Sequence, residues 1–247
     1  MVTETLVTET LDYADGTLKG YLAYDPAIEG ERPGILIVHE WWGHNDYVRK
    51  RACMLAALGY TALAIDMYGN GRQAKHPQEA GQFATQVLQN QSLGQARFQA
   101  ALDLLRAHST TDPQRIAAIG YCFGGAVVLQ MARSGSDLQG VVSFHGALST
   151  EQPAQAGDIK AKILVCHGAE DALITQEDID RFHEEMQEAE ADYQVRIYPG
   201  APHSFTNPDA DTYAQRFELP LGYDATADRE SWSAMLVFFE QIFADSP

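Results

Sequence analysis

The sequence predicts an α/β fold with a doubly wound, mostly parallel sheet and an antiparallel hairpin at its N-terminal edge. Three observations predict it: short continuous apolar runs, helical-period segments between several of them, and an alternating strand–turn–strand pattern at the start. Continuous apolar strands are typical of sheets buried on both faces. Strand–helix alternation predicts right-handed crossover connections. No Pro/Ser-rich linker or break in composition interrupts the chain, so residues 1–247 are expected to form a single domain.

The hairpin is predicted from the first residues of the chain. The pentapeptide VTETL occurs twice in tandem, at Val2–Leu6 and Val7–Leu11. Two copies of five residues are too short for a repeat architecture, and their alternation instead predicts an edge strand. Asp15 and Gly16 supply a turn, and the segment Thr17–Tyr24 reads as the second strand.

The remaining elements follow in order along the chain. The apolar runs that predict buried strands are Gly34–Glu40, Tyr60–Asp66, Arg115–Tyr121, Gln139–Gly146, Ala161–Gly168 and Tyr193–Gly200. The segments with helical spacing are Tyr47–Leu58, Ser92–His108, the segment that follows Thr175, and Ser231–Phe243. Gly59 is a suitable helix end, and Thr175 with Asp178 three residues later resembles a capping box.

Charge and cysteine content exclude several classes of function. The chain carries 17 basic and 34 acidic side chains, a net charge of 17 − 34 = −17, which argues against nucleic acid or an anionic membrane as a partner. The N-terminus lacks the basic and apolar regions of a signal peptide, and no apolar run is long enough for a membrane span. Three cysteines make a poor disulfide framework, which favours a reducing, cytoplasmic location.

Cys122 lies in a motif typical of nucleophilic catalysis. An apolar strand runs into Gly120-Tyr121-Cys122-Phe123-Gly124 and a helix follows at once, which is the G-x-S-x-G nucleophile turn with Cys in place of Ser. The flanking glycines relieve crowding of the backbone in a strained turn. The start of the next helix favours a thiolate and offers N–H groups to a developing oxyanion. The alternative is a buried cysteine in a glycine-rich turn.

Asp171 and His203 are the candidate partners of Cys122. Each follows the end of a predicted strand, where open α/β sheets bind ligands, and they come after the nucleophile in the chain order of this motif. His203 is expected to act as general base, with Asp171 fixing its tautomer. Taken singly, Asp171 reads equally well as a helix cap and His203 as a loop residue.

Glu40 ends another predicted strand and is the fourth candidate for the catalytic site. A carboxylate beside a nucleophilic cysteine would control its protonation. The residue after it, Trp41, stands where the second oxyanion donor is expected, so the backbone N–H groups of Trp41 and Phe123 form the predicted oxyanion hole. The alternative for Glu40 is a surface acid at a strand end.

Five stretches, spread in order over most of the chain, resemble the dienelactone hydrolase family. They are Ile37–Gly43, Gly59–Gly69, Gly120–Ala126, Gly168–Ile174 and Ala201–Phe205. The resemblance implies an α/β-hydrolase fold and a Cys122–His203–Asp171 triad. It also implies that Glu40 keeps the thiol poorly reactive until substrate binds.

The sequence departs from the family at the substrate's carboxylate. Members that hydrolyse dienelactone hold it with two arginines, yet Gln73–Gln95 contains no Arg, and Ser-Phe-Thr-Asn-Pro follows His203. Arg72 and Lys75 are the available substitutes, although Lys does not replace a planar Arg fork. The aromatic residues expected to line the pocket with Arg72 are Trp42, Tyr68 and Phe205.

The function predicted from these residues is cofactor-free hydrolysis of small esters or lactones through an acyl-enzyme on Cys122. The alternative is a non-catalytic binding or sensing protein that keeps the α/β-hydrolase fold. A metal-dependent hydrolase is a third alternative, because His39, Glu40 and His44 are close in sequence, but the two histidines are five residues apart and begin on a strand. No metal is expected, and the chain is expected to be a monomer or homodimer.

Overall fold

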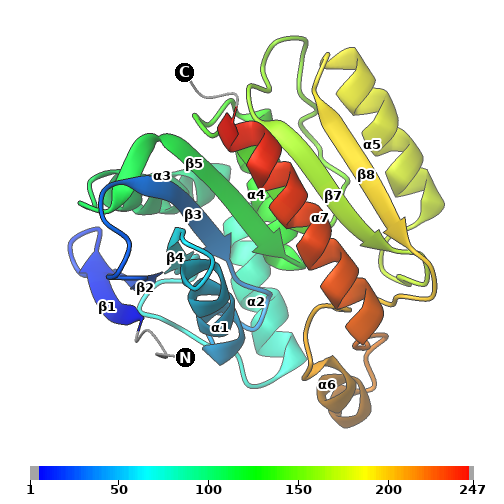
Figure 1. The fold of residues 1–247 in the computed structure, drawn as a ribbon. Coiled ribbons are helices and arrows are strands. Elements are labelled where there is room, and N and C mark those ends of the chain that lie inside the picture. Colours follow the sequence, from blue (N-terminus) through cyan, green and yellow to red (C-terminus); the bar gives the residue numbers. More distant parts are fainter. Residues whose placement is uncertain (1–5, 245–247) are drawn as a thin grey trace. The chain divides into compact units, whose positions relative to one another are not determined.

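The computed structural model describes residues 6–244 (Figure 1). These residues group into two compact units, with the boundary between Ala118 and Ile119. The prediction of a single domain stays a prediction. The first copy of the VTETL repeat begins in residues 2–5, which lie outside the described residues.

The first unit contains the predicted N-terminal hairpin. Strands β1 (Val7–Tyr13) and β2 (Leu18–Tyr24) pair antiparallel, with Val7 opposite Tyr24 and Tyr13 opposite Leu18. Strand β2 pairs antiparallel with β4 (Thr61–Ile65), and β4 pairs parallel with β3 (Arg32–Val38). The alternating polar residues therefore lie at an edge, as predicted, and the apolar runs lie further inside.

Three helices belong to the first unit. Helix α1 (Asp46–Ala56) and helix α3 (Gln91–Arg106) pack on its strands, and α2 (Pro77–Leu88) packs on α3. Gly59, the predicted helix end, has a φ of 95°, a conformation that glycine adopts without strain. The strand β5 (Thr111–Tyr121) starts in this unit and ends in the second one.

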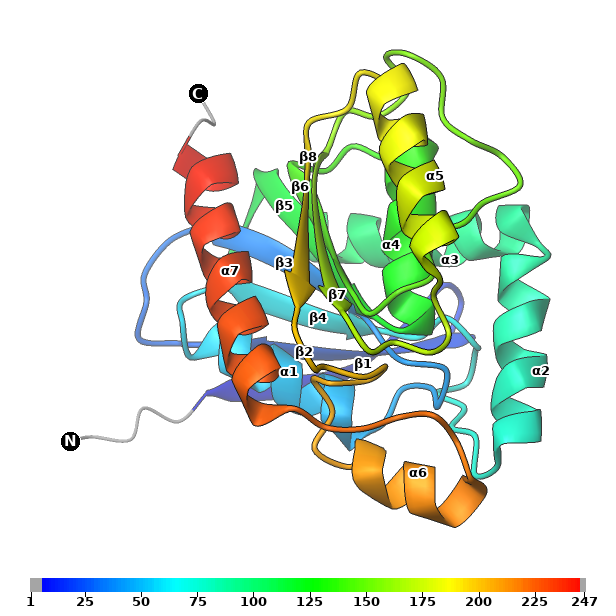
Figure 2. The same ribbon diagram turned by 90° about the vertical axis from the view of Figure 1, so that its right-hand side faces the viewer.

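The second unit has three layers. Strands β6 (Gly140–Phe144), β7 (Lys162–Gly168) and β8 (Tyr193–Tyr198) are all parallel. Figure 2 shows α4 (Phe123–Arg133) and α5 (Gln176–Glu188) on one face of these strands and α7 (Ala225–Ala244) on the other. The short helix α6 (Ala210–Phe217) lies at the end of the unit that carries the loops. The predicted parallel strands and antiparallel N-terminal hairpin are thus confirmed.

The register of the parallel strands explains where the functional loops emerge. Phe144 of β6 is opposite Cys166 of β7, and Gly168 at the end of β7 is opposite Tyr198 at the end of β8. Strands β7 and β8 end at the same level and β6 ends two residues before the end of β7, so the loops that follow them leave the sheet at the same edge. This is the edge at which open α/β sheets bind ligands.

Candidate active site

Cys122 lies between a strand and a helix, as its motif predicts. Strand β5 ends at Tyr121 and α4 begins at Phe123, and Cys122 between them has φ 52° and ψ −113°. This backbone conformation is unfavourable for a residue other than glycine, and such strain persists only where the surroundings impose it. Gly120 makes the turn possible, because a Cβ there would lie 2.0 Å from the carbonyl oxygen of Gly124.

The sulfur of Cys122 stands at the start of an eleven-residue helix and remains half-buried. Its side chain makes no capping hydrogen bond to α4. The N–H groups of the first helical turn have no partner within the helix, and they carry the positive end of its dipole. The backbone at Phe123 is therefore placed to meet negative charge that develops next to the sulfur.

Two backbone hydrogen bonds tie together the loops that carry Asp171 and His203. The N–H of Ala169 donates to the carbonyl of Tyr198 at 2.9 Å, and the N–H of Glu170 donates to the carbonyl of Ala201 at 3.0 Å. These loops follow β7 and β8, which are neighbours in the sheet. The sheet register therefore places a carboxylate and an imidazole together although they are 32 residues apart in sequence.

The carboxylate of Asp171 holds the imidazole of His203 in one orientation. Its Oδ2 accepts a hydrogen bond from Nδ1 of His203 at 2.8 Å, and its Oδ1 accepts from the N–H of Leu173 at 2.9 Å. The two side chains are almost fully buried, with exposed fractions of 0% and 5%. Because Nδ1 donates to the carboxylate, the lone pair of a neutral His203 is on Nε2.

Charge from two sides acts on His203. Burial alone would lower the pKa of its imidazole, but the Cys122 sulfur and the Asp171 carboxylate outweigh this effect and raise the pKa of His203 to about 10. Among the described residues, Nε2 of His203 has no partner that meets the geometric criteria of a hydrogen bond. Its interaction with the sulfur of Cys122 is therefore longer or less well aligned than a standard hydrogen bond. The raised pKa favours the protonated, positively charged form of His203 next to the sulfur of Cys122.

His145 is a third polar residue beside this pair, and no motif in the sequence marks it as a catalytic candidate. It follows β6 directly and is fully buried. Its Nδ1 lies 3.1 Å from the backbone nitrogen of Cys122, and its Nε2 lies 2.7 Å from Oγ1 of Thr206. Its ring meets the ring of His203 edge to face, with centroids 5.3 Å apart.

Glu40 and Trp41 belong to the first unit and are held there by backbone contacts. Glu40 is buried, and its carbonyl accepts from Nδ1 of His39 at 2.6 Å and from the N–H of Gly43 at 3.1 Å. The carbonyl of Trp41 accepts from the hydroxyl of Tyr68 at 3.0 Å. These contacts fix the loop after β3 in which both predicted site residues lie.

The guanidinium group of Arg72 is partly occupied within the first unit. It donates to the carbonyl of Tyr68 through Nε at 3.1 Å and through an Nη atom, and it lies over the ring of Phe83, 4.5 Å from its centroid. Lys75 is exposed to solvent. The predicted pocket aromatics are almost fully buried: Trp42, Tyr68 and Phe205 have exposed fractions of 3%, 1% and 0%.

The histidines near Glu40 make hydrogen bonds to the backbone. Nε2 of His39 accepts from the N–H of Met67 at 3.2 Å while its Nδ1 donates to Glu40, so both ring nitrogens are occupied. Burial lowers the pKa of His39 to about 4, which keeps it neutral. Nε2 of His44 donates to the carbonyl of Ala64 at 3.0 Å. Within residues 6–244, no cluster of three or more His, Cys, Asp or Glu has the geometry of a metal site.

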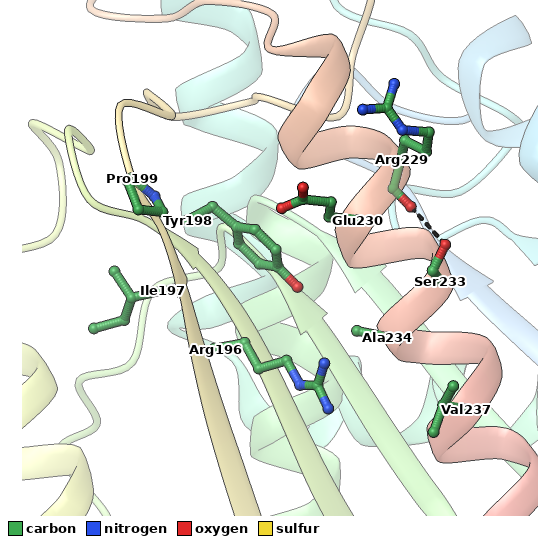
Figure 3. Close-up of a pocket in the computed structure, with 9 residues that line it drawn as sticks. All are labelled: Arg196, Ile197, Tyr198, Pro199, Arg229, Glu230, Ser233, Ala234 and Val237. Carbon is green, nitrogen blue, oxygen red and sulfur yellow. Dashed lines mark hydrogen bonds between the residues drawn. The ribbon is translucent and has the colours of Figure 1, made fainter.

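A groove of about 720 Å³ lies between β8 and α7 and contains none of the candidate catalytic residues (Figure 3). Arg196 and Tyr198 point from β8 toward α7, whereas Ile197 points away from the helix. The hydroxyl of Tyr198 donates to the sulfur of Cys166 at 3.7 Å, and burial raises the pKa of that thiol to about 12. Cys166 is thus a buried cysteine whose thiol stays protonated and unreactive at neutral pH.

Among the described residues, no helix is both long enough and apolar enough to cross a lipid bilayer. This agrees with the lack of a long apolar run in the sequence.

Comparison with known proteins identifies the family. The family model described as the dienelactone hydrolase family matches residues 18–243. A dienelactone hydrolase-like promiscuous phosphotriesterase from metagenomic libraries is 38% identical, with a TM-score of 0.89 over 96% of this chain and 98% of that one. A protein of Aquifex aeolicus with the provisional name carboxymethylenebutenolidase is 26% identical over 90% of this chain and 93% of its own length.

A more distant structure bears on the fold alone. An α/β-hydrolase enzyme from a deep-sea metagenome library of the Medee basin is 16% identical, with a TM-score of 0.69 over 97% of this chain and 98% of that one. The predicted α/β-hydrolase fold is therefore confirmed. With a family model that matches nearly the whole chain, the protein belongs to the dienelactone hydrolase family of ester and lactone hydrolases.

Proposed function

We propose that this protein hydrolyses small esters or lactones through an acyl-enzyme on Cys122, with His203 as the general base and acid and Asp171 as its orienting partner. One observation carries the proposal. A buried carboxylate–imidazole pair, joined at 2.8 Å, lies beside a cysteine on a strained strand–helix turn. This combination supplies a nucleophile, a base and an orienting group, which are the three parts of a triad.

The first half of the reaction forms a thioester. The Cys122 thiolate attacks the carbonyl carbon, and the carbonyl π electrons move to oxygen, where N–H groups at the start of α4 stabilise the charge. Collapse of this intermediate breaks the bond to the leaving oxygen, which takes a proton from Nε2 of His203. In a lactone, the leaving oxygen stays attached to the acyl group.

The second half releases the acid. Nε2 of His203 accepts a proton from a water molecule, whose oxygen attacks the thioester carbon. The carbon–sulfur bond then breaks and the Cys122 thiolate is restored. Asp171 stays ionised throughout and stabilises the imidazolium form of His203.

The family resemblance adds a role for Glu40, which we propose controls the charge on the thiol before substrate binds. Its support is a carboxylate buried at the end of β3, in the loop where the family places this residue. Replacing Glu40 with Gln should change the rate at which iodoacetamide labels Cys122 in the substrate-free enzyme. An unchanged labelling rate would argue against this role.

Turnover of a panel of activated esters and lactones tests the nucleophile. Cys122→Ala should lower kcat/KM by about a thousandfold or more while the unfolding temperature stays near that of wild type, because the covalent step is lost. Cys53→Ala is the matched control and should keep its activity. Full activity in Cys122→Ala would overturn the proposed nucleophile. A wild type that is inactive on every substrate yet stabilised by them would favour a binding protein instead.

A phosphotriester belongs in the same panel. The metagenomic relative at 38% identity is described as a promiscuous phosphotriesterase. We propose that Cys122 also attacks activated phosphotriesters, because a thiolate beside an oxyanion site can displace a leaving group from phosphorus as well as from carbon. Loss of both activities in Cys122→Ala would support a shared nucleophile, and a phosphotriesterase activity that persists would refute it.

The arginines of the chain bear on the charge of the preferred substrate. Arg is missing at both positions where members of the family hold the carboxylate, and the available substitute, Arg72, already donates to Tyr68 and stacks on Phe83. We therefore propose neutral or weakly charged esters and lactones, rather than anionic dienelactones, as the preferred substrates. The three cysteines without disulfides fit a reducing compartment, which we propose is the cytoplasm.

A further inference from the structure

We infer that His145 is a positioning residue for the nucleophile: as a neutral acceptor it holds the backbone of Cys122, and it links this turn to the loop that carries His203. The inference rests on the proposed function, since it takes Cys122 as the nucleophile. His145 lies outside the proposed triad and would affect the reaction indirectly, by holding Cys122 in place.

The tautomer of His145 follows from its partners. A backbone N–H can only donate, so Nδ1 of His145 must accept the hydrogen bond from Cys122 at 3.1 Å. The proton of the neutral ring is then on Nε2, which donates to Oγ1 of Thr206 at 2.7 Å. A second proton on the ring would occupy Nδ1 and break the bond to Cys122. The contact therefore requires an uncharged His145.

The contact acts on the strained part of the turn. The N–H of Cys122 is shared between the carbonyl of Phe144 at 3.0 Å and Nδ1 of His145. This fixes the peptide plane before Cys122, whose φ of 52° then sets the direction of both the sulfur and the N–H of Phe123. Two acceptors on one N–H oppose the relaxation that an unfavourable φ would otherwise allow.

His145 is itself firmly held. Its backbone N–H donates to the carbonyl of Cys166 at 2.8 Å, and it adopts a φ of 40°, which is also unfavourable for a non-glycine residue. Phe205, which is fully buried, meets its ring edge to face with centroids 5.2 Å apart. Tyr198, whose ring faces the groove of Figure 3, packs behind Phe205 with centroids 5.6 Å apart. Strain of this kind is maintained where the surroundings impose it and is found preferentially at active sites.

The same ring couples the two halves of the proposed catalytic pair. Thr206 is three residues after His203, so the bond from Nε2 anchors the loop of the general base while Nδ1 anchors the turn of the nucleophile. The ring also packs edge to face on His203, with an interplanar angle of 66°. His145 thus sets the spacing between the sulfur and the imidazole, on which the rate of attack depends steeply.

Two substitutions separate the contacts of His145. In His145→Asn, Oδ1 takes the place of Nδ1 and accepts from Cys122, but the side chain no longer reaches Thr206. In His145→Gln, the amide reaches Thr206 and the acceptor beside Cys122 is lost. We expect kcat of His145→Gln to fall by about tenfold to a hundredfold with KM within about threefold of wild type. We expect His145→Asn to keep a kcat at least about fivefold higher than His145→Gln.

A second readout distinguishes positioning from stability. The rate of labelling of Cys122 by iodoacetamide, with Cys53 as the internal reference, should fall in His145→Gln more than in His145→Asn. Equal kcat values in the two variants, or losses that follow the unfolding temperature, would overturn the inference. If His145→Gln does not fold, Thr206→Val tests the inference instead, because it removes the hydrogen-bond partner of Nε2 and leaves His145 in place. Releasing Nε2 should lower kcat by about threefold to tenfold, and an unchanged kcat would overturn the inference.

The proposed function and this inference fail differently. Activity that survives in Cys122→Ala removes the nucleophile, and with it the proposed function. An inactive Cys122→Ala together with equally active His145 variants removes only the role of His145.

Discussion

His203 has a charge state that can be measured directly. Burial lowers its pKa, but Cys122 and Asp171 raise it to about 10, so we expect the ring to be protonated at neutral pH in the substrate-free enzyme. Cys122→Ser removes the sulfur that contributes to this rise, and the titration midpoint of His203 should fall by more than about one pH unit. Titration of the His203 ring by NMR measures both midpoints. Identical midpoints in the two proteins would contradict the pairing with Cys122.

The same shift has a consequence for stability. The folded-state pKa of His203 lies above the value of about 6.5 expected in the unfolded chain. Its stabilising contribution is therefore complete below about pH 6.5 and is lost as the pH rises through about 10. The difference in unfolding free energy between wild type and His203→Gln should narrow over this range, which urea denaturation at several pH values measures.

Residues at the site differ in how far the sequence could predict them. Cys122, Asp171 and His203 were predicted because each follows a strand end in a motif of known order, and the structure brings the last two within 2.8 Å. His145 also follows a strand end, but a single histidine there has no partner in sequence. Only the fold shows that its ring reaches Thr206, 61 residues further along the chain.

Helix α4 is held at its far end by a buried ion pair. Nε and an Nη atom of Arg133 donate to the two carboxylate oxygens of Glu185 on α5, at 2.8 and 2.7 Å. The same ion pair binds the loop after β6, through the carbonyl of Leu148 at 2.7 Å and the N–H of Ala154 at 3.0 Å. The pair therefore fixes the nucleophile helix to its neighbours without contacting the site.

Breaking this pair should destabilise the protein more than it impairs the reaction. Glu185→Gln leaves a buried Arg133 without a counter-charge, which we expect to cost about 3–5 kcal/mol in unfolding free energy. The Arg133→Met and Glu185→Leu double variant should lose less unfolding free energy than the two single variants lose together, since it leaves no buried charge unpaired. Urea midpoints measure both, and kcat of the folded variants should stay within about threefold of wild type. A Glu185→Gln protein as stable as wild type would contradict this role.

Elements were predictable where burial imposes a pattern. The apolar strands lie where their runs predict them, and the capping box of Thr175 and Asp178 forms at the start of α5. The sequence did not predict helices α2 and α6, because too few of their residues are buried to produce an apolar repeat at helical spacing. Helix α2 buries only Ala80 and Val87, and α6 buries only Ala210. Helix α7 begins six residues before the predicted Ser231, since its first turns are mostly polar.

The charge of the whole molecule gives a test of substrate preference that does not depend on any one contact. A net charge of −17 repels anionic substrates over distances comparable to the Debye length, and added salt weakens this repulsion. For an anionic lactone, kcat/KM should therefore rise by about twofold to fivefold between low and high ionic strength. For a neutral lactone of the same size, it should not change.

The direction of the salt effect distinguishes two ways of binding a carboxylate. If Arg72 or another cation held the substrate, local attraction would dominate, and salt would lower kcat/KM for the anionic lactone. Arg72→Gln would then remove both the preference for the anion and its salt dependence. If the family's carboxylate clamp is absent, Arg72→Gln should leave the rise with salt intact. Measurement of kcat/KM against ionic strength for both lactones, in wild type and Arg72→Gln, therefore decides whether the acidic chain selects against anionic substrates.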